Sequence, residues 1–419
     1  MKFKVIDGGV TAPKGFLASG IHCGVKEGTT KKDLALIYSE VMANGAGMYT
    51  LNKVKGAPIQ ISKNHLHNGK AQAIIVNSGN ANTCNGENGL KDAETMTKVQ
   101  AKALNIDTQD VVVASTGVIG VPLNIDAIIN GIPCLTKSLS KDGSKAAAES
   151  IMTTDTFMKE YSIEFEIGGK TISLGAIAKG SGMIEPNMGT MLSFITTDLA
   201  ISSDLLKEAL KETVKVSYNR ITVDGDTSTN DTVFLLANGL AENEEITEKN
   251  EDYNSFVEAL KEVCITISKM LAKDGEGATK LIECTVNGAY TEDDADVLAK
   301  SVIKSSLVKT AIFGSDANWG RILCALGYSG ANFDPDKVDV YFESEAGSIQ
   351  VCKAGASLPF SEDLAKEILL KDEVKIKVDL FLGDASVTVW GCDLTYDYVK
   401  LMEIIEVNNF FGGEYLNEY

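Results

Sequence analysis

Apolar positions recur with a helical period in three stretches of the chain. Segment 31–41 (KKDLALIYSEV) predicts a helix, because apolar residues return at helical spacing after two threonines that can cap the first turn. The apolar positions are Leu34, Ile37, Tyr38 and Val41, and the caps are Thr29 and Thr30. Segments 202–217 and 254–273 also predict amphipathic helices, and the second is expected to end at Asp274-Gly275.

Strand patterns separate these helices. Segment 71–86 predicts a buried strand that runs into a Gly/Asn loop, and segment 110–123 predicts an apolar strand interrupted at residues 115–117. Segment 163–178 alternates around Gly168-Gly169, which predicts a hairpin with a tight turn.

Two later segments complete the picture. Residues 281–289 predict a strand, and residues 372–399 predict antiparallel strands. We therefore expect a mixed α/β protein with largely antiparallel sheets layered with helices, rather than a doubly wound Rossmann chain.

Length and charge limit the classes of function. A chain of 419 residues is too long for one compact core, so two or more lobes are expected. Apolar residues make up 44% and charged residues 23%, which is typical of soluble globular proteins. The formal net charge of −19 argues against nucleic-acid and anionic-membrane partners but permits a local basic pocket.

Cysteine and histidine usage indicates the compartment and narrows the chemistry. Eight cysteines without a C-x-x-C pair predict reduced thiols in the cytoplasm, and neither a secretory signal nor an apolar run long enough to span a membrane is expected. The three histidines are His22, His65 and His67, so a His-based triad or metal site has few candidates. His22 and Cys23 are adjacent and would point apart, which favours a structural role.

Two segments resemble a phosphate-binding loop and a calcium-binding loop but lack a required residue at the correct spacing. GGKT at residues 168–171 lacks the first glycine of a phosphate loop, because Glu164 occupies that position. DGDTSTND at residues 224–231 has Leu235, not Glu, at the twelfth position of a calcium loop. A hairpin turn and a polar turn explain these two segments better.

Thr190 follows Gly189 where a glycine-rich stretch meets an apolar, strand-like run. An N-terminal threonine can use its own α-amino group, with a pKa of about 7.7–8.0, as the base that an internal hydroxyl lacks. Attack of the hydroxyl on the preceding carbonyl would expose this amine, and Gly189 tolerates the distorted backbone required. On composition alone, a threonine that merely opens a strand is the favoured interpretation.

Residues 179–198 (KGSGMIEPNMGTMLSFITTD) closely resemble the self-cleavage segment of the ornithine acetyltransferase family, the bifunctional glutamate N-acetyltransferases of the cyclic arginine pathway. Other segments resemble the family in its own order, over roughly residues 8–400. They are VNSGNANTCNG, ASTGVIG, MTTDT, NRITVDGDTSTNDT, KDGEGATK, FGSDANWGRI and DLTYDYVK.

The resemblance implies self-cleavage between Gly189 and Thr190, into an α chain (1–189) and a β chain (190–419). Thr190 would then take the acetyl group of N-acetylornithine as an ester and pass it to glutamate. Thr116 and Gly117 match the family's oxyanion-hole pair. A hydroxyl and a backbone N–H at an interrupted strand suit a developing oxyanion, and the same residues also suit a β-bulge.

Three further residues match substrate-binding positions of the family. Lys179 matches a substrate-contacting lysine, whose ammonium group suits a carboxylate. Thr153 matches a substrate-binding threonine, and Glu276 matches the carboxylate that meets the substrate's amino group. Taken alone, Lys179 and Glu276 would be solvated charges and Thr153 a helix cap.

The chain departs from the family pattern at two places. Position 189 is Gly where the family more often has Ala, which is compatible with cleavage. Met402 stands where the family has a substrate-binding Asn, and residues 401–419 replace the usual short ending. Asn408 and Asn409 are the candidates to substitute for that Asn.

The resemblance also implies the DmpA/ornithine acetyltransferase-like fold, no cofactor and no metal, and a cytoplasmic heterotetramer of two α and two β chains. It leaves open whether acetyl-CoA is a second acetyl donor. Two other functions stay open on sequence grounds. One is an N-terminal-threonine amidohydrolase or aminopeptidase, in which water accepts the acyl group, and the other is an uncleaved, inactive relative.

Overall fold

The computed structural model of the chain describes residues 2–26, 28–185 and 191–411, and for 404–411 only the backbone. The described residues form two compact units, as the length of the chain predicts. Unit 1 contains residues up to 219 and 226–267, and unit 2 contains 220–225 and 268–410. The predicted α and β chains divide the polypeptide at a bond instead, and unit 1 holds residues from both.

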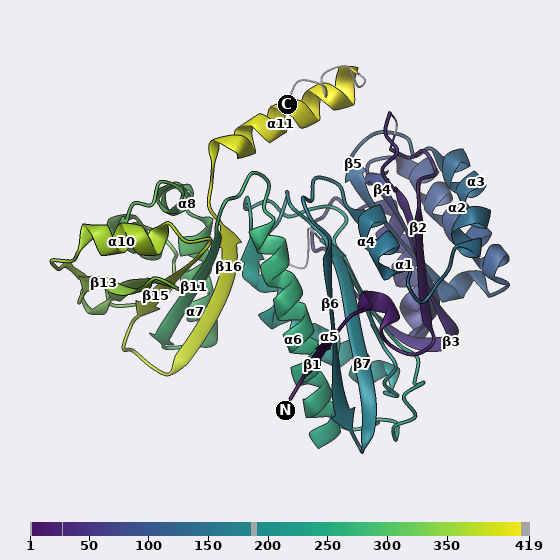
Figure 1. Cartoon of the computed structure of the whole chain (residues 1–419), viewed down its shortest axis with the longest axis horizontal. Coiled ribbons are helices and arrows are strands. Elements are labelled where there is room, and N and C mark those ends of the chain that lie inside the picture. Colours follow the sequence, from purple (N-terminus) through teal and green to yellow (C-terminus); the bar gives the residue numbers. More distant parts are fainter. Residues whose placement is uncertain (1, 27, 186–190, 412–419) are drawn as a thin grey trace. The chain divides into compact units, whose positions relative to one another are not determined.

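Unit 1 is built on a nine-stranded sheet with the strand order β1-β6-β7-β8-β10-β3-β4-β5, and β2 pairs with β3 (Figure 1). The strands are β1 (Lys4–Ile6), β2 (Phe16–Ile21), β3 (Leu34–Tyr49), β4 (Lys70–Asn80), β5 (Val111–Val118), β6 (Lys159–Ile167), β7 (Lys170–Lys179), β8 (Leu192–Thr197) and β10 (Thr232–Ala237). Only the β4–β5 and β8–β10 pairs among these described strands are parallel, which confirms the prediction of a largely antiparallel sheet.

Helices cover this sheet. They are α1 (Ala57–His65), α2 (Gly86–Leu104), α3 (Ile125–Lys137), α4 (Ser144–Ile151), α5 (Ser203–Val216) and α6 (Glu251–Lys273), and the boundary between the units falls within α6. Helices α2 and α3 pack beside each other, α2 on β4 and β5 and α3 on β2 and β3 (Figure 1). Ile75, Val113 and Ile132 belong to one buried cluster. A second cluster joins Ile37 and Ile74 to Phe194 and Phe234, so the long strand β3 contributes to two cores.

The helix predicted for segment 31–41 is wrong, because residues 34–49 form strand β3. The helical stripe required one buried face, yet Ala35 and Leu36, which lie off that stripe, are fully buried. Val41, the last member of the stripe, is 38% exposed. Neighbours on both faces of β3 bury consecutive residues. Because apolar residues then occur without a strand-like alternation, the pattern also fits a helix.

The other predicted elements of unit 1 are confirmed. The hairpin β6–β7 turns at Gly168 and Gly169, whose φ angles of +56° and +73° match a type I′ turn. Segment 71–86 begins as strand β4, and the two amphipathic patterns correspond to α5 and α6. Helix α6 ends at Lys273, directly before the predicted Asp274-Gly275 stop.

Unit 2 contains a seven-stranded sheet with the order β14-β13-β12-β15-β11-β16-β9. Its strands are β9 (Ile221–Thr222), β11 (Leu281–Ala289), β12 (Asp339–Ser344), β13 (Gly347–Lys353), β14 (Ala356–Ser357), β15 (Glu373–Asp379) and β16 (Ala385–Cys392). Its helices are α7 (Glu292–Lys304), α8 (Ser306–Phe313), α9 (Trp319–Gly327), α10 (Glu362–Leu369) and α11 (Tyr396–Phe411). Short 3-10 turns of the whole chain cover Gly9–Thr11, Leu66–Asn68, Thr108–Asp110, Tyr218–Arg220 and Pro335–Lys337.

The strands predicted within 372–399 exist but are not neighbours. Strand β11 lies between them, parallel to β15 and antiparallel to β16. The last residues of the segment begin helix α11 instead of continuing as a strand. Pairing with a strand some 90 residues earlier is a tertiary choice that local alternation cannot reveal.

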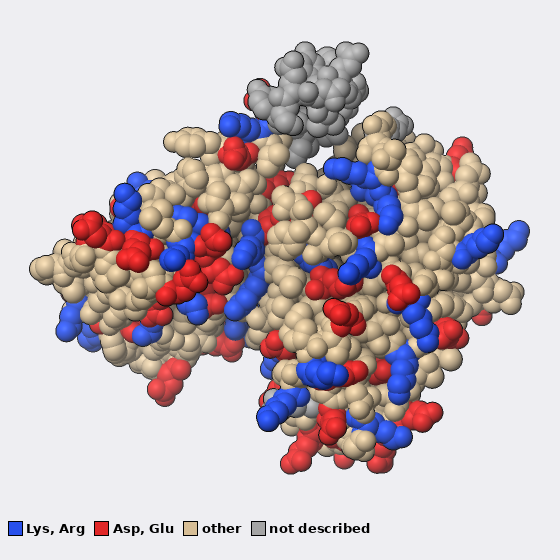
Figure 2. All heavy atoms as spheres, viewed as in Figure 1, with Lys and Arg blue, Asp and Glu red and all other residues tan. Residues whose placement is uncertain are grey.

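The surface and the thiols agree with the bulk expectations. On the described part of the face in Figure 2, acidic and basic side chains are interspersed, without an extended basic area. No helix among the described residues has the length and apolarity needed to cross a membrane. All eight cysteines are free thiols.

Candidate active site

Thr116 and Gly117 lie at the carboxyl end of β5, next to the end of β4. The parallel ladder pairs Gly79 with Gly117 and then becomes irregular, since Asn80 faces both Thr116 and Val118. Thr116 is half-buried, and its hydroxyl forms no hydrogen bond with the residues that the structure describes. The ladder irregularity and a free hydroxyl therefore occur at the same point of the strand.

Gly117 has no room for a side chain. Its φ is +132°, and a Cβ built there would lie 2.3 Å from the carbonyl carbon of Gly79 and 2.5 Å from the nitrogen of Asn80. The glycine itself is exposed. An exposed backbone beside a free hydroxyl can bind a developing oxyanion, which is the role predicted for Thr116 and Gly117.

Asn230 connects the end of β5 to the loop that enters β10. Its side-chain nitrogen donates to the carbonyl of Ala81 at 2.5 Å and to the carbonyl of Ser115 at 2.9 Å. Its side-chain oxygen accepts the Thr83 hydroxyl at 2.6 Å. Because Ser115 precedes Thr116, this buried amide fixes the backbone from which the Thr116 hydroxyl projects.

Lys179 lies at the end of β7 and is only 6% exposed. Its ammonium group forms neither a hydrogen bond nor an ion pair with the residues that the structure describes. A buried ammonium without a partner is costly, and such a group is retained most readily where a ligand brings the opposite charge. Its surroundings therefore suit the predicted contact with a substrate carboxylate.

Thr153 and Lys179 are linked through Asp155. The Asp155 carboxylate accepts the backbone N–H of Thr153 at 3.0 Å and the backbone N–H of Gly180 at 2.6 Å. It also accepts the Lys159 ammonium at 2.7 Å, and both side chains of this ion pair are fully buried. One carboxylate thus organises the loop carrying Thr153 and the residue that follows Lys179.

Charge keeps Asp155 ionised despite its burial. Burial raises the pKa of Asp155, but the charges of Lys179 and Lys159 and the hydrogen bonds from Lys159 and Gly180 outweigh it. The resulting pKa is lowered to about 2. Asp155 is therefore an anion throughout the physiological pH range.

Strand β8 begins beside Lys179. Gly189 and Thr190 lie outside the described residues, and Met191 is the first described residue after them. Leu192, two residues after Thr190, pairs with Lys179 in β7 and with Thr232 in β10. The pairing of Leu192 thus brings the chain beside Lys179 two residues after the predicted nucleophile, whose own position lies outside the described residues.

Asp231 is a second buried carboxyl group at this place. It is 3% exposed, and its Oδ2 has no hydrogen-bond partner among the described residues. Burial raises the pKa of Asp231 well above its usual range, although the Thr50 hydroxyl, the Met191 backbone and the Lys179 charge oppose this shift. Asp231 therefore keeps its proton to a higher pH than a solvated aspartate does.

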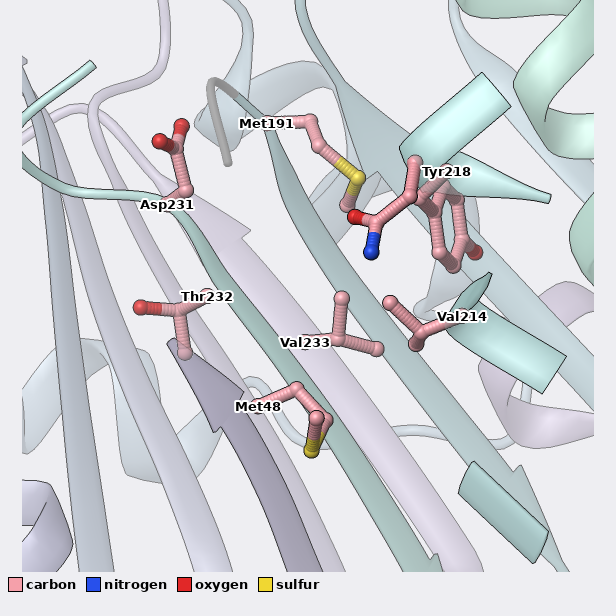
Figure 3. Close-up of a pocket in the computed structure, with 8 residues that line it drawn as sticks. Met48, Met191, Val214, Tyr218, Asp231, Thr232 and Val233 are labelled. Carbon is pink, nitrogen blue, oxygen red and sulfur yellow. The ribbon is translucent and has the colours of Figure 1, made fainter. Parts of the chain in front are cut away.

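A small cavity lies between the starts of β8 and β10 (Figure 3). Its volume is about 10 Å³, which is room for a single water molecule and not for an amino-acid substrate. In Figure 3 the side chains of Met48, Met191 and Val233 gather around it, and the carboxyl group of Asp231 points away from them. The cavity is therefore a packing gap in the hydrophobic core next to the candidate site, not a substrate pocket.

A larger hollow of about 630 Å³ lies elsewhere in unit 1, between α1 and the start of α2. Lys55, Gln60, Asn82 and Asn85 are among its lining residues. It contains none of the residues predicted for catalysis or substrate binding. The larger of these two hollows is therefore not the predicted active site.

Glu276 belongs to unit 2, in the turn between α6 and β11, and is 9% exposed. Thr395 donates its hydroxyl to the Gly277 carbonyl at 2.6 Å, and Asp393 accepts the Thr279 N–H at 2.8 Å. These bonds hold the turn of Glu276 against the segment that leads into α11. Its contact with the substrate stays a prediction.

The described part of the atypical tail, residues 401–411, belongs to helix α11. Met402 lies in α11 and is half-buried, and the backbone of Asn408 and Asn409 belongs to the same helix. The side chains of these two asparagines are outside the described part of the chain, so their substitute role stays a prediction.

The structural role predicted for His22 and Cys23 is confirmed. The His22 Nδ1 lies 2.9 Å from the Lys31 carbonyl and 3.1 Å from the Asp33 carboxylate. The Cys23 backbone donates to Asp33 at 2.6 Å, and burial, with Asp33 adding to it, raises the pKa of the Cys23 thiol to about 12. Such a thiol is a poor nucleophile at neutral pH.

The sequence analysis did not single out the buried polar residues of the site. Asp155 lies within the quoted motif MTTDT, and Asn230 and Asp231 lie within NRITVDGDTSTNDT. The motifs therefore marked the right segments. Only burial and hydrogen bonding distinguish these side chains from the solvated polar residues of ordinary turns.

Comparison with known proteins places the chain in a family. The ArgJ family profile matches residues 17–402. The "Arginine biosynthesis bifunctional protein ArgJ" of Caldanaerobacter subterraneus subsp. tengcongensis is 53% identical over 398 residues, covering 95% of this chain and 98% of that protein. The protein of the same name from Bacillus subtilis is 48% identical over 397 residues, covering 94% and 96%.

Solved structures give matches of the same kind. The crystal structure of ArgJ from Bacillus halodurans is 48% identical, with a TM-score of 0.49, covering 51% of this chain and 99% of that one. Ornithine acetyltransferase from Mycobacterium tuberculosis, complexed with ornithine, is 34% identical, with a TM-score of 0.41, covering 44% and 99%. Since the profile spans most of the chain and the full-length relatives are about half identical to it, the chain belongs to the ArgJ family.

Proposed function

We propose that this chain is a glutamate N-acetyltransferase, which moves the acetyl group of N2-acetyl-L-ornithine to L-glutamate. Membership of the ArgJ family and the relatives' name, which assigns them to arginine biosynthesis, support this function. The structural observation that carries it is the buried ammonium of Lys179, which has no hydrogen-bond or ion-pair partner among the described residues. In the sheet, Lys179 pairs with Leu192, two positions after Thr190. The carboxylate of a substrate would form an ion pair with this ammonium group.

The first step is self-cleavage. The Thr190 hydroxyl attacks the carbonyl carbon of Gly189, and the acyl group shifts from nitrogen to oxygen. Water then hydrolyses the ester, which leaves a carboxylate on Gly189 and a free α-amine on Thr190. This amine is the general base for the second step.

Acetyl transfer uses the new N-terminus. The Thr190 oxygen attacks the acetyl carbonyl of N-acetylornithine, the α-amine takes the hydroxyl proton and passes it to the leaving nitrogen, and ornithine departs. The α-amino group of glutamate then attacks the acetyl ester, and the proton returns to the Thr190 oxygen. Thr116 and Gly117 stabilise each tetrahedral oxyanion, at about 3–4 kcal/mol per donor.

Three residues orient the substrates in this scheme. Lys179 binds a carboxylate, and Thr153 is held in place by the hydrogen bond from its backbone to Asp155. The Glu276 carboxylate binds the amino group of the substrate. No metal or cofactor takes part in any of these steps.

Intact mass spectrometry tests the scheme. The purified protein should give two fragments that together account for 44.7 kDa plus one water, and Thr190→Ala should give a single uncut chain. Incubation with N-acetylornithine should add one acetyl mass to the fragment that begins at Thr190. Transfer of the acetyl group to water instead of glutamate would identify an amidohydrolase, and an uncut wild-type chain would identify an inactive relative.

We also propose acetyl-CoA as a second acetyl donor, because the relatives are named bifunctional. Acetylglutamate formation from each donor, measured separately with the same enzyme, tests this. Product from N-acetylornithine alone would restrict the enzyme to one donor.

We propose, finally, that two copies of each fragment form a cytoplasmic heterotetramer. The eight free thiols support a reducing compartment. Native mass spectrometry should give the mass of two α and two β chains, and fractionation of the cells should place both fragments with the cytoplasmic proteins.

A further inference from the structure

Lys26 is a lysine near the site to which the proposed function gives no role. It lies in the loop after β2, and its side chain is half-buried. Its Nζ donates to the carbonyl of Lys32 and to the carbonyl of Met152, each at 2.8 Å. An ammonium group has three hydrogens, so two bonds leave one donor for another acceptor.

Lys26 contacts two segments of the candidate site. Met152, whose carbonyl it binds, directly precedes Thr153. Its stem packs against Gly79, where a Cβ would lie 2.8 Å from the Cγ of Lys26, and Gly79 pairs with Gly117. Lys26 therefore lies between the predicted oxyanion pair and the loop of Thr153.

The charge of Lys26 has no carboxylate partner in the described part of the chain. Glu27, the next residue, lies outside the described part of the chain. Asp33 accepts the backbone N–H groups of Gly24, Val25 and Lys26 itself, at 2.8–3.1 Å. Burial lowers the pKa of Lys26 to about 8, the charges of Lys31 and Lys179 act in the same direction, and Asp33 and Asp155 oppose them. An anion bound beside Lys26 would stabilise its charged form and raise its pKa again.

The two substrates of the proposed function differ in charge at the end of the side chain. N-acetylornithine ends in an ammonium group, whereas glutamate ends in a carboxylate. Both substrates share the α-carboxylate, which suits Lys179. A second cation is thus required for glutamate alone, and Lys26 supplies one.

We propose that Lys26 binds the side-chain carboxylate of glutamate, while Lys179 binds the α-carboxylate that both substrates carry. This inference rests on the proposed function and assigns Lys26 the selection of the acceptor. Two ammonium groups without carboxylate partners, close enough for their charges to interact, form a site for a dicarboxylate.

The test separates the two half-reactions. The acetyl-enzyme is formed from N-acetylornithine alone, and its decay is then followed in single-turnover experiments at increasing concentrations of glutamate. Lys26→Gln, which removes the charge and keeps N–H donors for the two carbonyls, should raise the half-saturating glutamate concentration about tenfold to a hundredfold. Acetyl-enzyme formation should change less than twofold, and Lys26→Arg should retain most of the glutamate affinity.

Two comparisons sharpen the result. The wild-type enzyme should prefer glutamate to glutamine, and Lys26→Gln should lose most of this preference. Lys31→Gln removes a charge from an exposed side chain of the same loop and should leave both half-reactions unchanged. Thermal unfolding of each variant identifies any general loss of structure.

Each alternative outcome has a distinct meaning. If Lys26→Gln saturates with glutamate as the wild type does, or weakens both half-reactions equally, the assignment of Lys26 is wrong. A variant that unfolds, together with a Lys26→Arg variant that keeps its fold but loses glutamate selection, would likewise overturn it. A wild-type protein that forms no acetyl-enzyme would overturn the proposed function and this inference with it.

Discussion

Lys179 and Lys159 are two buried lysines of one cluster with opposite surroundings. Lys159 forms an ion pair of 2.7 Å with Asp155, whereas the Lys179 ammonium has no partner among the described residues. We expect different roles for them, because removing Lys159 leaves the buried Asp155 carboxylate without its ion-pair partner, whereas removing the Lys179 charge breaks no hydrogen bond or ion pair among the described residues.

Replacing each lysine by methionine should separate binding from stability. We expect Lys179→Met to shift the melting temperature by only a few degrees while raising the KM for N-acetylornithine about tenfold to a hundredfold, through loss of a charged hydrogen bond. Lys159→Met should instead lower the free energy of unfolding by about 3–5 kcal/mol. Steady-state kinetics and denaturant titration measure both effects, and equal destabilisation by the two changes would contradict the assignment of Lys179.

Asp231 makes stability depend on pH in a direction opposite to that of most acidic residues. Its pKa is raised in the folded chain, so the folded chain holds a proton that the unfolded chain has lost above pH 4 or so. Its contribution to stability is complete below the unfolded pKa and is lost as the pH rises toward the folded pKa.

Asp231→Asn keeps the shape and removes this titration. The variant should gain stability relative to the parent as the pH rises above about 4, the pKa of aspartate in the unfolded chain, by at most about 1.4 kcal/mol per pH unit. Denaturant unfolding in an uncut Thr190→Ala background measures this difference without any effect of processing. Parallel pH profiles for the two proteins would show that Asp231 ionises normally.

At the scale of elements, the β4–β5 pair depends on glycine at one position. Gly117→Ala should destabilise the pair and lower acetyl-enzyme formation about a hundredfold or more, because the new methyl group meets the Gly79 carbonyl carbon at 2.3 Å and displaces an oxyanion donor. Mass spectrometry of the acetylated fragment gives the rate.

Gly120→Ala is the matched control for this change. Gly120 also has a positive φ, of +79°, but no atom lies within 4 Å of a Cβ built there. Gly120→Ala should lower the free energy of unfolding by about 1–2 kcal/mol through backbone strain and leave the acetylation rate unchanged. If both alanines slow acetylation equally, the close approach of β4 and β5 at Gly117 is not the cause.

Elements with an unambiguous local signal were predictable from sequence, and strand β3, whose pattern also fits a helix, was not. The hairpin at Gly168-Gly169 and helix α5 have local signals, a turn that needs positive φ and a single apolar stripe. Strand β3 is buried on both faces, so its pattern contained a helical stripe by coincidence. Tertiary contacts decided its conformation.

The same distinction applies to the site. Thr116, Gly117 and Lys179 entered through a family resemblance, which marks positions without explaining them. Burial and hydrogen bonding among the described residues leave the Lys179 ammonium without a hydrogen-bond partner and raise the pKa of Asp231. A single sequence carries no signal for which polar side chain lacks a partner after folding.

At the scale of the whole molecule, the proposed cleavage leaves the sheet of unit 1 intact. Strands β8 and β10 would belong to the β chain, and they lie between β7 and β3 of the α chain. Six residue pairs join β7 to β8, and six more join β10 to β3. Separating the fragments would therefore expose the buried side chains of central strands, including Phe194 and Phe234.

The two fragments should accordingly stay associated without any covalent link. Wild-type protein should run as two bands on a denaturing gel and elute as one species containing both fragments, even after dilution to nanomolar concentration. The reason is that fragment dissociation requires the same loss of buried apolar surface as unfolding of the sheet, so it should occur only at denaturant concentrations that also abolish the circular dichroism of unit 1. Fragments that separate on dilution while keeping their secondary structure would show that β8 and β10 are not the centre of a shared sheet.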